Sequence, residues 1–182
     1  MKQRLGYHSL MARRLKDQIN KRDAFASFEE EAMLNVYRTA SHLSGPEHAL
    51  FKSRGLSAAG YNLLGILRGH RLCGGKSAGV EGVRASEIGC EMVVRMPDVT
   101  RLVDRLEKMK LVSRHEGEDD KRVKMVRITA DGLGLLDELE PVVGRLMRDQ
   151  LGHLSSTELK ELSRLLELVR DEDGERENPP KK

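Results

Sequence analysis

The sequence predicts a mainly helical fold with one small β-hairpin, and three observations support this prediction. Most of the chain between residues 23 and 170 places apolar residues at steps of three and four, which is typical of amphipathic helices. One segment, residues 111–128, instead has β-branched strands of period two around a polar, glycine-containing tip, which is typical of a hairpin. Hydrophobic residues make up 38% of the 182 residues, enough for one helical domain of ordinary size.

The first predicted helix has a single apolar face that begins at Phe25. Its members are Phe25, Phe28, Ala32, Val36, Ala40 and Leu43. We expect Ser44-Gly45-Pro46 to interrupt this helix, because proline lacks the backbone donor that a helix interior needs. Pro46 would then begin a short turn through Phe51, with Gly55 as a C-cap.

The second predicted helix runs from Ala58 to about Arg68, with Ser57 as its N-cap. Five glycines within residues 69–82 predict a flexible loop after it. A short helix follows over residues 85–92. Pro97 opens the next helix, whose inward stripe is Val99, Leu102, Val103, Leu106 and Met109.

The predicted strands cover residues 111–115 and 123–128, joined by a polar tip. Thr129 caps a helix that we expect to kink at Pro141. Ser155 and Glu158 form a capping box that starts the last helix. Two short helices followed by a hairpin is the element order of a winged helix-turn-helix, here flanked by further helices at both ends.

The net charge of +3 is distributed unevenly along the chain. The net charge is +6 in residues 1–22 and +4 in residues 56–128, but −2, −3 and −2 in residues 23–55, 129–170 and 171–182. A basic excess in one arm and one central block is typical of a protein with a polyanionic partner. We divide the chain accordingly into a flexible basic arm (1–22), an N-terminal helical region (23–55), a winged helix-turn-helix (56–128), C-terminal helices (129–170) and a disordered charged tail (171–182).

Several protein classes are excluded by composition. No apolar run approaches eighteen residues, and the basic N-terminus lacks the apolar centre of a secretory signal. Cys73 and Cys90 are too few for a disulfide scaffold and fit a reducing cytoplasm. Aromatic residues make up only 3% of the chain, which argues against a base-stacking platform for single strands. Neither an enzyme active site, a metal-site spacing nor a cofactor motif is present, so we expect no enzyme, metal or cofactor.

The predicted helix from Pro97 carries charged side chains on the face opposite its apolar stripe. These residues are Asp98, Arg101, Arg105 and Lys108. Arginine suits bidentate contact with guanine in the major groove, and a helix-turn-helix reads bases with the first turns of its second helix. The alternative is a solvated face, with Asp104 and Lys108 forming an ordinary i,i+4 pair.

The tip of the predicted hairpin is also basic. Lys121, Arg122 and Lys124 lie beside Asp119 and Asp120. An arginine on a ribbon can enter a minor groove and sense its negative potential, while a neighbouring aspartate holds it in position. The alternative is an ordinary charged turn.

Three separate motifs in this order resemble the MarR family of multiple-antibiotic-resistance regulators. They are Val99-Thr100-Arg101-Leu102-Val103-Asp104-Arg105-Leu106-Glu107 continuing into Leu111-Val112-Ser113-Arg114, then Asp120-Lys121-Arg122, and then Val126-Arg127-Ile128-Thr129-Ala130-Asp131-Gly132. Gly55-Leu56-Ser57, Tyr61-Asn62-Leu63-Leu64 and Ser86-Glu87-Ile88 match the family upstream. The resemblance covers about residues 31–169. The basic arm and the glycine-rich loop at 69–82 extend the family pattern.

This resemblance implies a ligand-responsive, DNA-binding homodimer, more often a repressor, on a pseudo-palindromic double-stranded site. It implies that residues 23–55 and 129–170 form the N-terminal and C-terminal dimerisation helices. It implies that Arg122 enters the minor groove with Asp120 orienting it. The full set of candidate DNA-binding residues is Ser86, Arg95, Met96, Asp98, Thr100, Arg101, Arg105, Lys121, Arg122 and Lys124. The family commonly responds to phenolic or other aromatic effectors, and some members respond to oxidants through cysteine.

Two alternatives stay open from the residues themselves. Arg95 lies near Cys90 in the sequence, and a positive neighbour can make a cysteine reactive toward oxidants, but a small buried hydrophobe is the simpler interpretation of Cys90. Cys73 falls in the glycine-rich loop. For the whole chain, the second hypothesis is a ligand-binding or protein-interaction module on the same scaffold that no longer binds DNA.

Overall fold

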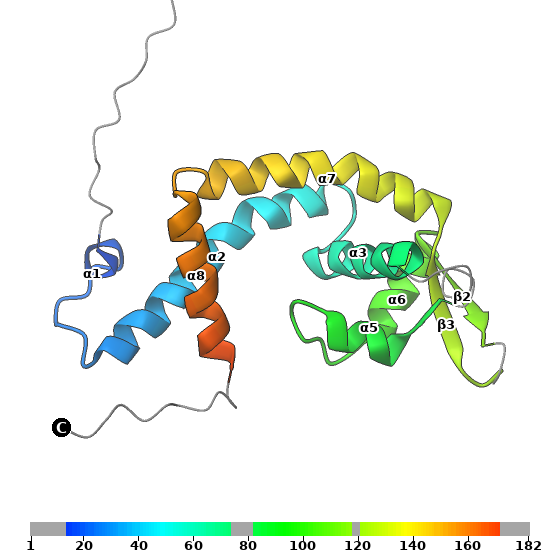
Figure 1. The fold of residues 1–182 in the computed structure, drawn as a ribbon, viewed down its shortest axis with the longest axis horizontal. Helices are drawn as coiled ribbons and strands as arrows, with labels where there is room; N and C mark the ends of the chain where they lie inside the picture. The colour runs from blue at the N-terminus through cyan, green and yellow to red at the C-terminus, as the bar shows by residue number, and fades with distance from the viewer. Residues whose placement is uncertain (1–13, 74–81, 118–120, 172–182) are drawn as a thin grey trace, which may run out of the picture. The chain divides into compact units, whose positions relative to one another are not determined.

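The computed structural model describes residues 14–73, 82–117 and 121–171. These residues form helices and one three-stranded antiparallel sheet, as the sequence predicts (Figure 1). The chain divides into two compact units, residues 1–50 and residues 51–182, which are described in turn. No helix among the described residues has the length and apolar character needed to cross a bilayer.

The first unit holds a short helix, α1 (Leu15–Gln18), and most of a long one, α2 (Phe28–Lys52). Between them, the Lys21 ammonium lies 5.5 Å from the centre of the Phe25 ring and 3.5 Å from the Glu30 carboxylate. The backbone N–H of Ala26 donates to the same Glu30 side chain at 2.6 Å. Helix α2 begins at Phe28, three residues later than its apolar face suggested, and Ser27 Oγ caps this end by accepting the Glu30 N–H at 3.2 Å.

Helix α2 corrects one prediction, because it continues through Pro46 where the sequence suggested an interruption. A proline inside a helix removes one backbone hydrogen bond, here the one that residue 46 would donate to the carbonyl of His42. Both residues are exposed, so water can take the place of the missing donor. The loss is therefore small enough for the helix to run on to Lys52.

The end of α2 lies where the sequence predicts it. Gly55 has a φ of +68°, a left-handed conformation that glycine adopts without a steric penalty. The N–H of Gly55 donates to the carbonyl of Lys52 at 3.0 Å, and the N–H of Leu56 donates to that of Phe51 at 2.9 Å. These two bonds satisfy carbonyls that the helix end leaves open.

The second unit begins with α3 (Ala58–Cys73), whose N-cap Ser57 accepts the Gly60 N–H at 3.1 Å. The helix is longer than predicted, because the first residues of the supposed loop 69–82 continue it as far as Cys73. His70 is held within this extension by Glu91, whose Oε1 lies 2.7 Å from the His70 Nε2. The rest of the glycine-rich stretch, residues 74–81, lies outside the described residues.

The helix-turn-helix consists of α5 (Ala85–Glu91) and α6 (Val99–Lys108). Both helices pack on α3, and the described part of this unit forms one apolar core (Figure 1). The fully buried core side chains include Leu63, Leu64, Ile88, Val103, Leu106 and Val126. Pro97 does not open α6 as predicted; Asp98 is the N-cap and the helix starts at Val99.

The sheet has the order β1-β3-β2, with β1 (Val83–Arg84), β2 (Val112–Glu116) and β3 (Lys124–Ile128). The predicted hairpin β2–β3 is confirmed, with Val112 opposite Ile128 and Glu116 opposite Lys124. Strand β1 was not predicted, because two residues are too short to show period-two alternation. It adds to the free edge of β3 by pairing Val83 with Val126.

The last helices of the described residues are α7 (Ala130–Leu151) and α8 (Ser156–Arg170). Both predicted N-caps are confirmed: Thr129 Oγ1 accepts the Gly132 N–H at 3.1 Å, and Ser155 Oγ accepts the Glu158 N–H at 3.3 Å. Helix α7 runs through Pro141 as one helix; a kink there stays a prediction. At its start, a Cβ on Gly132 would collide with the backbone carbonyl of Leu111, so this position requires glycine.

Candidate nucleic-acid interface

The N-terminal turn of α6 carries the strongest candidate for reading DNA. Asp98 accepts the backbone N–H of Arg101 at 2.9 Å and so fixes the start of the helix. Leu102, Val103 and Leu106 are buried, which turns the opposite face outward. The Arg101 side chain is 86% exposed, with its Nε 3.7 Å from a carboxylate oxygen of Asp98. The guanidinium is therefore oriented but available to a partner.

The other residues on the outer face of α6 differ in their contacts. Thr100 and Lys108 are exposed. Arg105, although also exposed, donates from Nη2 to the carbonyl of Gly55 at 2.9 Å. That bond ties the recognition helix to the connection between α2 and α3, so Arg105 has a structural contact in addition to any contact with DNA.

Arg114 on β2 is a residue that the sequence analysis did not select. Its guanidinium lies 2.7 Å from Glu107 and 2.5 Å from Asp104, both on α6, and it also donates to the Thr100 carbonyl at 3.3 Å. The Arg114 backbone N–H donates to Glu107 at 3.1 Å. Only 24% of the Arg114 side chain is exposed.

These contacts, which we name the Arg114 clamp, fasten the recognition helix to the first strand of the hairpin. The clamp also replaces the alternative pairing of Asp104 with Lys108, because the Asp104 carboxylate is engaged by Arg114. The signal in the sequence was the spacing: two carboxylates three residues apart on the helix, followed by an arginine on the next strand. Charge-assisted pairs of this kind are stronger than neutral hydrogen bonds.

The tip of the hairpin is only partly described. Lys121 and Arg122 are exposed, in the turn that leads into β3. Lys124 is also exposed, with its Nζ 3.1 Å from the Glu116 carboxylate across the hairpin. Asp120, the residue that the family resemblance makes the orienting partner of Arg122, lies outside the described residues.

The remaining candidates lie on α5 and in the turn before α6. Ser86 is exposed in the first turn of α5, and Arg95 is exposed in the turn. Met96 is half-buried, so part of its side chain serves packing. Cys90 is exposed on α5, which contradicts the prediction that it is a small buried hydrophobe. Its place on the outer side of a short helix explains the difference, because Ile88 is the residue of α5 that enters the core.

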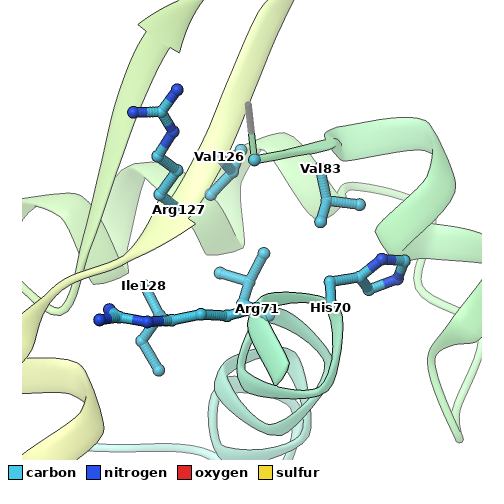
Figure 2. Close-up of a pocket in the computed structure, with 8 residues that line it drawn as sticks. His70, Arg71, Val83, Val126, Arg127 and Ile128 are labelled. Carbon is cyan, nitrogen blue, oxygen red and sulfur yellow. The ribbon is translucent and has the colours of Figure 1, made fainter. Parts of the chain in front are cut away.

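Figure 2 shows a small cavity between the C-terminal turns of α3 and the sheet. Its lining is Leu67, His70, Arg71, Gly82, Val83, Val126, Arg127 and Ile128. The cavity volume is about 80 Å³, whereas an engineered cavity that takes up benzene measures roughly 150 Å³. It is thus too small for an aromatic effector. Within the described part of the chain, no group of three or more His, Cys, Asp or Glu side chains is arranged to hold a metal ion.

Ion pairs join α3 and the connection before it to α7. Arg68 on α3 makes two hydrogen bonds to Glu140, at 2.8 and 3.1 Å, and lies 3.7 Å from Asp137. Hydrogen bonding to Arg68 lowers the pKa of Glu140, and the same bonds raise the pKa of the Arg68 guanidinium. Arg54 pairs with Glu138 on the same helix. Arg68 thus ties α3 to α7, and Arg54 ties the connection before α3 to the same helix.

Comparison with known proteins also identifies a winged helix-turn-helix in this part of the chain. A family model described as the MarR family matches residues 80–124, which hold β1, the helix-turn-helix and the start of the second hairpin strand. The crystal structure of a MarR transcription factor from Planctomyces limnophilus is 39% identical, covering 80% of this chain and 99% of that one, with a TM-score of 0.58.

Two more distant structures share the fold. BpsR from Bordetella bronchiseptica is 20% identical, with a TM-score of 0.68 over 82% of this chain and all of that one, and its DNA binding is regulated by 6-hydroxynicotinic acid. The MepR–DNA complex from S. aureus is also 20% identical, with a TM-score of 0.62 over 75% of this chain and 95% of that one. With the Planctomyces relative at 39% identity over nearly its whole length, the chain belongs to the MarR family of transcription regulators.

Proposed function

We propose that this MarR-family regulator binds a specific pseudo-palindromic DNA site as a homodimer and represses transcription until a small aromatic effector releases it. The observation that carries the proposal is the position and exposure of the Arg101 side chain. Its side chain is 86% exposed at the first turn of α6, while the apolar stripe on the other side of the helix is buried. A recognition helix presents its base-reading residues in this position.

The division of labour within the interface follows from the chemistry of each group. Arg101 offers bidentate donors for guanine, and the Thr100 hydroxyl can donate or accept at a base edge or a phosphate. Ser86, at the start of α5, and Arg95 are suited to phosphate oxygens, which position the helix without reading sequence. Arg122 and Lys121 at the hairpin tip would enter the minor groove, with Asp120 orienting Arg122 as in the family pattern.

The proposal of a homodimer rests on apolar side chains that the chain leaves uncovered. On α7 and α8 the exposed members are Met147, Leu162, Leu165, Leu168 and Val169. On α2 they are Phe28, Met33, Val36 and Tyr37. Helix α8 has no buried residue at all. A second copy of the chain would cover such faces and place two recognition helices about 34 Å apart, one helical turn of DNA.

The proposal of an aromatic effector is drawn from relatives, and the proposal of repression from the family resemblance alone. BpsR is regulated by 6-hydroxynicotinic acid, and CouR from Rhodococcus jostii has been crystallised with p-coumaroyl-CoA. Both are aromatic compounds that carry an acid or acyl group. We infer an effector of that class, acting in the cytoplasm, where the cysteines stay reduced.

The deciding experiment measures the affinity of the full chain for a labelled duplex from the region upstream of its own gene. We expect a shift at moderate salt, a steep loss of affinity as salt rises, and release by an aromatic acid. Arg101→Ala should weaken binding tenfold or more, since a good bidentate base contact contributes about 1–3 kcal/mol. The matched control, Lys181→Ala, removes one positive charge from the tail and should change affinity much less.

The opposite result is equally informative. If Arg101→Ala and Lys181→Ala lose affinity equally, the assignment of α6 as the reading helix is wrong. If no duplex shifts at moderate salt, the alternative of a ligand-binding or protein-interaction module on this scaffold takes its place.

A further inference from the structure

Two exposed valines stand in the turn of the helix-turn-helix, where a soluble protein has little reason to keep them. Val93 is 85% exposed and Val94 is 68% exposed, although the preceding Met92 is 6% exposed and anchors the turn in the core. Their position is also fixed, because the Val93 N–H donates to Asn62 Oδ1 on α3 at 2.9 Å. The turn therefore presents two apolar side chains outward on a held backbone.

The uncovered apolar face that we assign to the homodimer does not account for this pair. The other exposed large apolar side chains of the described residues lie in residues 19–37, at Leu72, and in residues 147–169. None of them belongs to α5, to α6 or to the turn between them. Val93 and Val94 instead adjoin the proposed reading residues in the chain, since Arg95 follows directly and Asp98 caps the recognition helix four residues later.

The major groove of DNA offers one apolar feature at the base edges, the 5-methyl group of thymine. Valine suits a contact with that methyl, because its two γ-methyl groups are held in few rotamers and little side-chain freedom is lost on binding. Resting on the proposed function, the geometry points to a specificity role: we propose that Val93 and Val94 contact thymine methyl groups beside the bases that Arg101 reads, and so favour A·T pairs there.

The test replaces thymine by deoxyuridine, which keeps every hydrogen-bonding group and removes only the methyl. The probe is the tightest-binding duplex that the full-length protein selects from a random-sequence library, with each thymine exchanged in turn. We expect one or two symmetric positions at which the exchange weakens binding about fourfold, the factor that corresponds to one buried methyl group. At those positions Val93→Ala or Val94→Ala should bind thymine and deoxyuridine equally.

Leu72→Ala is the matched control, because Leu72 is an exposed apolar side chain on α3, 76% exposed, outside the turn. That variant should keep the full dependence on the methyl group. If the wild type binds every deoxyuridine duplex as tightly as its thymine counterpart, or if both valine variants keep the dependence, the contact does not exist and the valines serve another partner. If the chain selects no duplex, the proposed function itself is wrong, which is a different outcome from loss of the methyl dependence alone.

Discussion

Helices α6 and α8 are both amphipathic, and both begin with a side-chain cap, but the apolar face of α6 is buried whereas that of α8 is exposed. Helix α6, ten residues long, buries Leu102, Val103 and Leu106. Helix α8, fifteen residues long, buries no residue. Their polar contacts differ in the same way. The carboxylates of α6 hold Arg114 from another element, while Arg164 on α8 pairs with Glu161 one turn away on the same helix.

The difference teaches what each helix depends on. Packing of an amphipathic face supplies most of a helix's stability in a protein. Helix α6 has that packing within its own chain, so its geometry is set before DNA arrives. Helix α8 buries no side chain among the described residues and has mainly local contacts, such as its cap and the Arg164–Glu161 pair, so its exposed apolar face is the one we propose to be covered by a second copy of the chain. The four predictions below test this contrast, from the largest expected effect to the smallest.

The largest effect is expected from leucine truncation on the two helices. Leu106 is 1% exposed, and Leu106→Ala should lower the free energy of unfolding by about 2–5 kcal/mol through lost burial and the cavity left behind. Leu165 is 47% exposed, and Leu165→Ala should act mainly through dimerisation. Urea unfolding at two protein concentrations checks this. An equal loss for both variants at high dilution would show that α8 is packed within its own chain.

The second effect is expected from the Arg114 clamp. Arg114→Ala leaves the α6 carboxylates of Asp104 and Glu107 without their cation, and we expect a loss of about 2 kcal/mol in unfolding free energy. Affinity for DNA should fall as well, although Arg114 itself is mostly covered. Arg114→Lys should restore only part of both, since lysine cannot bridge two carboxylates in a fork. Arg164→Ala on α8 is the control and should change neither; DNA affinity unaffected by Arg114→Ala would contradict the positioning role.

The clamp also illustrates how far the sequence could be interpreted. The caps Ser57, Thr129 and Ser155, the left-handed Gly55 and the β-hairpin follow from local rules, and all were predicted. Features decided by contacts across the chain were not. Strand β1 exists because β3 offers an open edge to Val83, and Arg114 acquires its role only when β2 lies along α6.

Helix ends also show that local sequence rules can fail, here by predicting an end where the helix continues. Proline at 46 and glycine at 69 are local signals to stop, but the helices continue through both. Their propensity costs, about 3 kcal/mol for proline and about 1 kcal/mol for glycine, can be outweighed by the rest of the structure. For the candidate site, the exposure of Arg101 agrees with its predicted role, while the DNA contacts of all the candidate residues stay predictions.

The third effect, of opposite sign, is expected where α6 ends. Lys110 has a φ of +61°, with its N–H donating to the Glu107 carbonyl at 2.8 Å. A left-handed conformation disfavours any residue with a Cβ, so Lys110→Gly should raise the free energy of unfolding by roughly 1 kcal/mol. Gly55→Ala, at the matching end of α2, should lower it. Thermal unfolding of both variants checks the pair, and a destabilised Lys110→Gly would mean that the lysine side chain has a contact that offsets the strain.

The smallest effect is expected from pH, through the pairing of Arg68 with Glu140 that joins α3 to α7. Arg68 lowers the pKa of Glu140 in the folded chain, so the unfolded chain binds more protons as acid is added. The stability that this pair contributes is therefore complete above the ordinary carboxyl pKa of about 4.3 and is lost as pH falls through the lower, folded value.

In Glu140→Gln the contribution of this pair is absent at every pH. Urea midpoints of wild type and Glu140→Gln should accordingly differ near pH 7 and converge towards pH 3, with the difference reduced by salt because the Glu140 side chain is 57% exposed. Glu167→Gln, an exposed carboxylate on α8, is the control. A gap between wild type and Glu140→Gln that stays constant across this range would show that the difference in stability does not come from the charge of Glu140, and that its ion pair with Arg68 contributes nothing to holding α3 against α7.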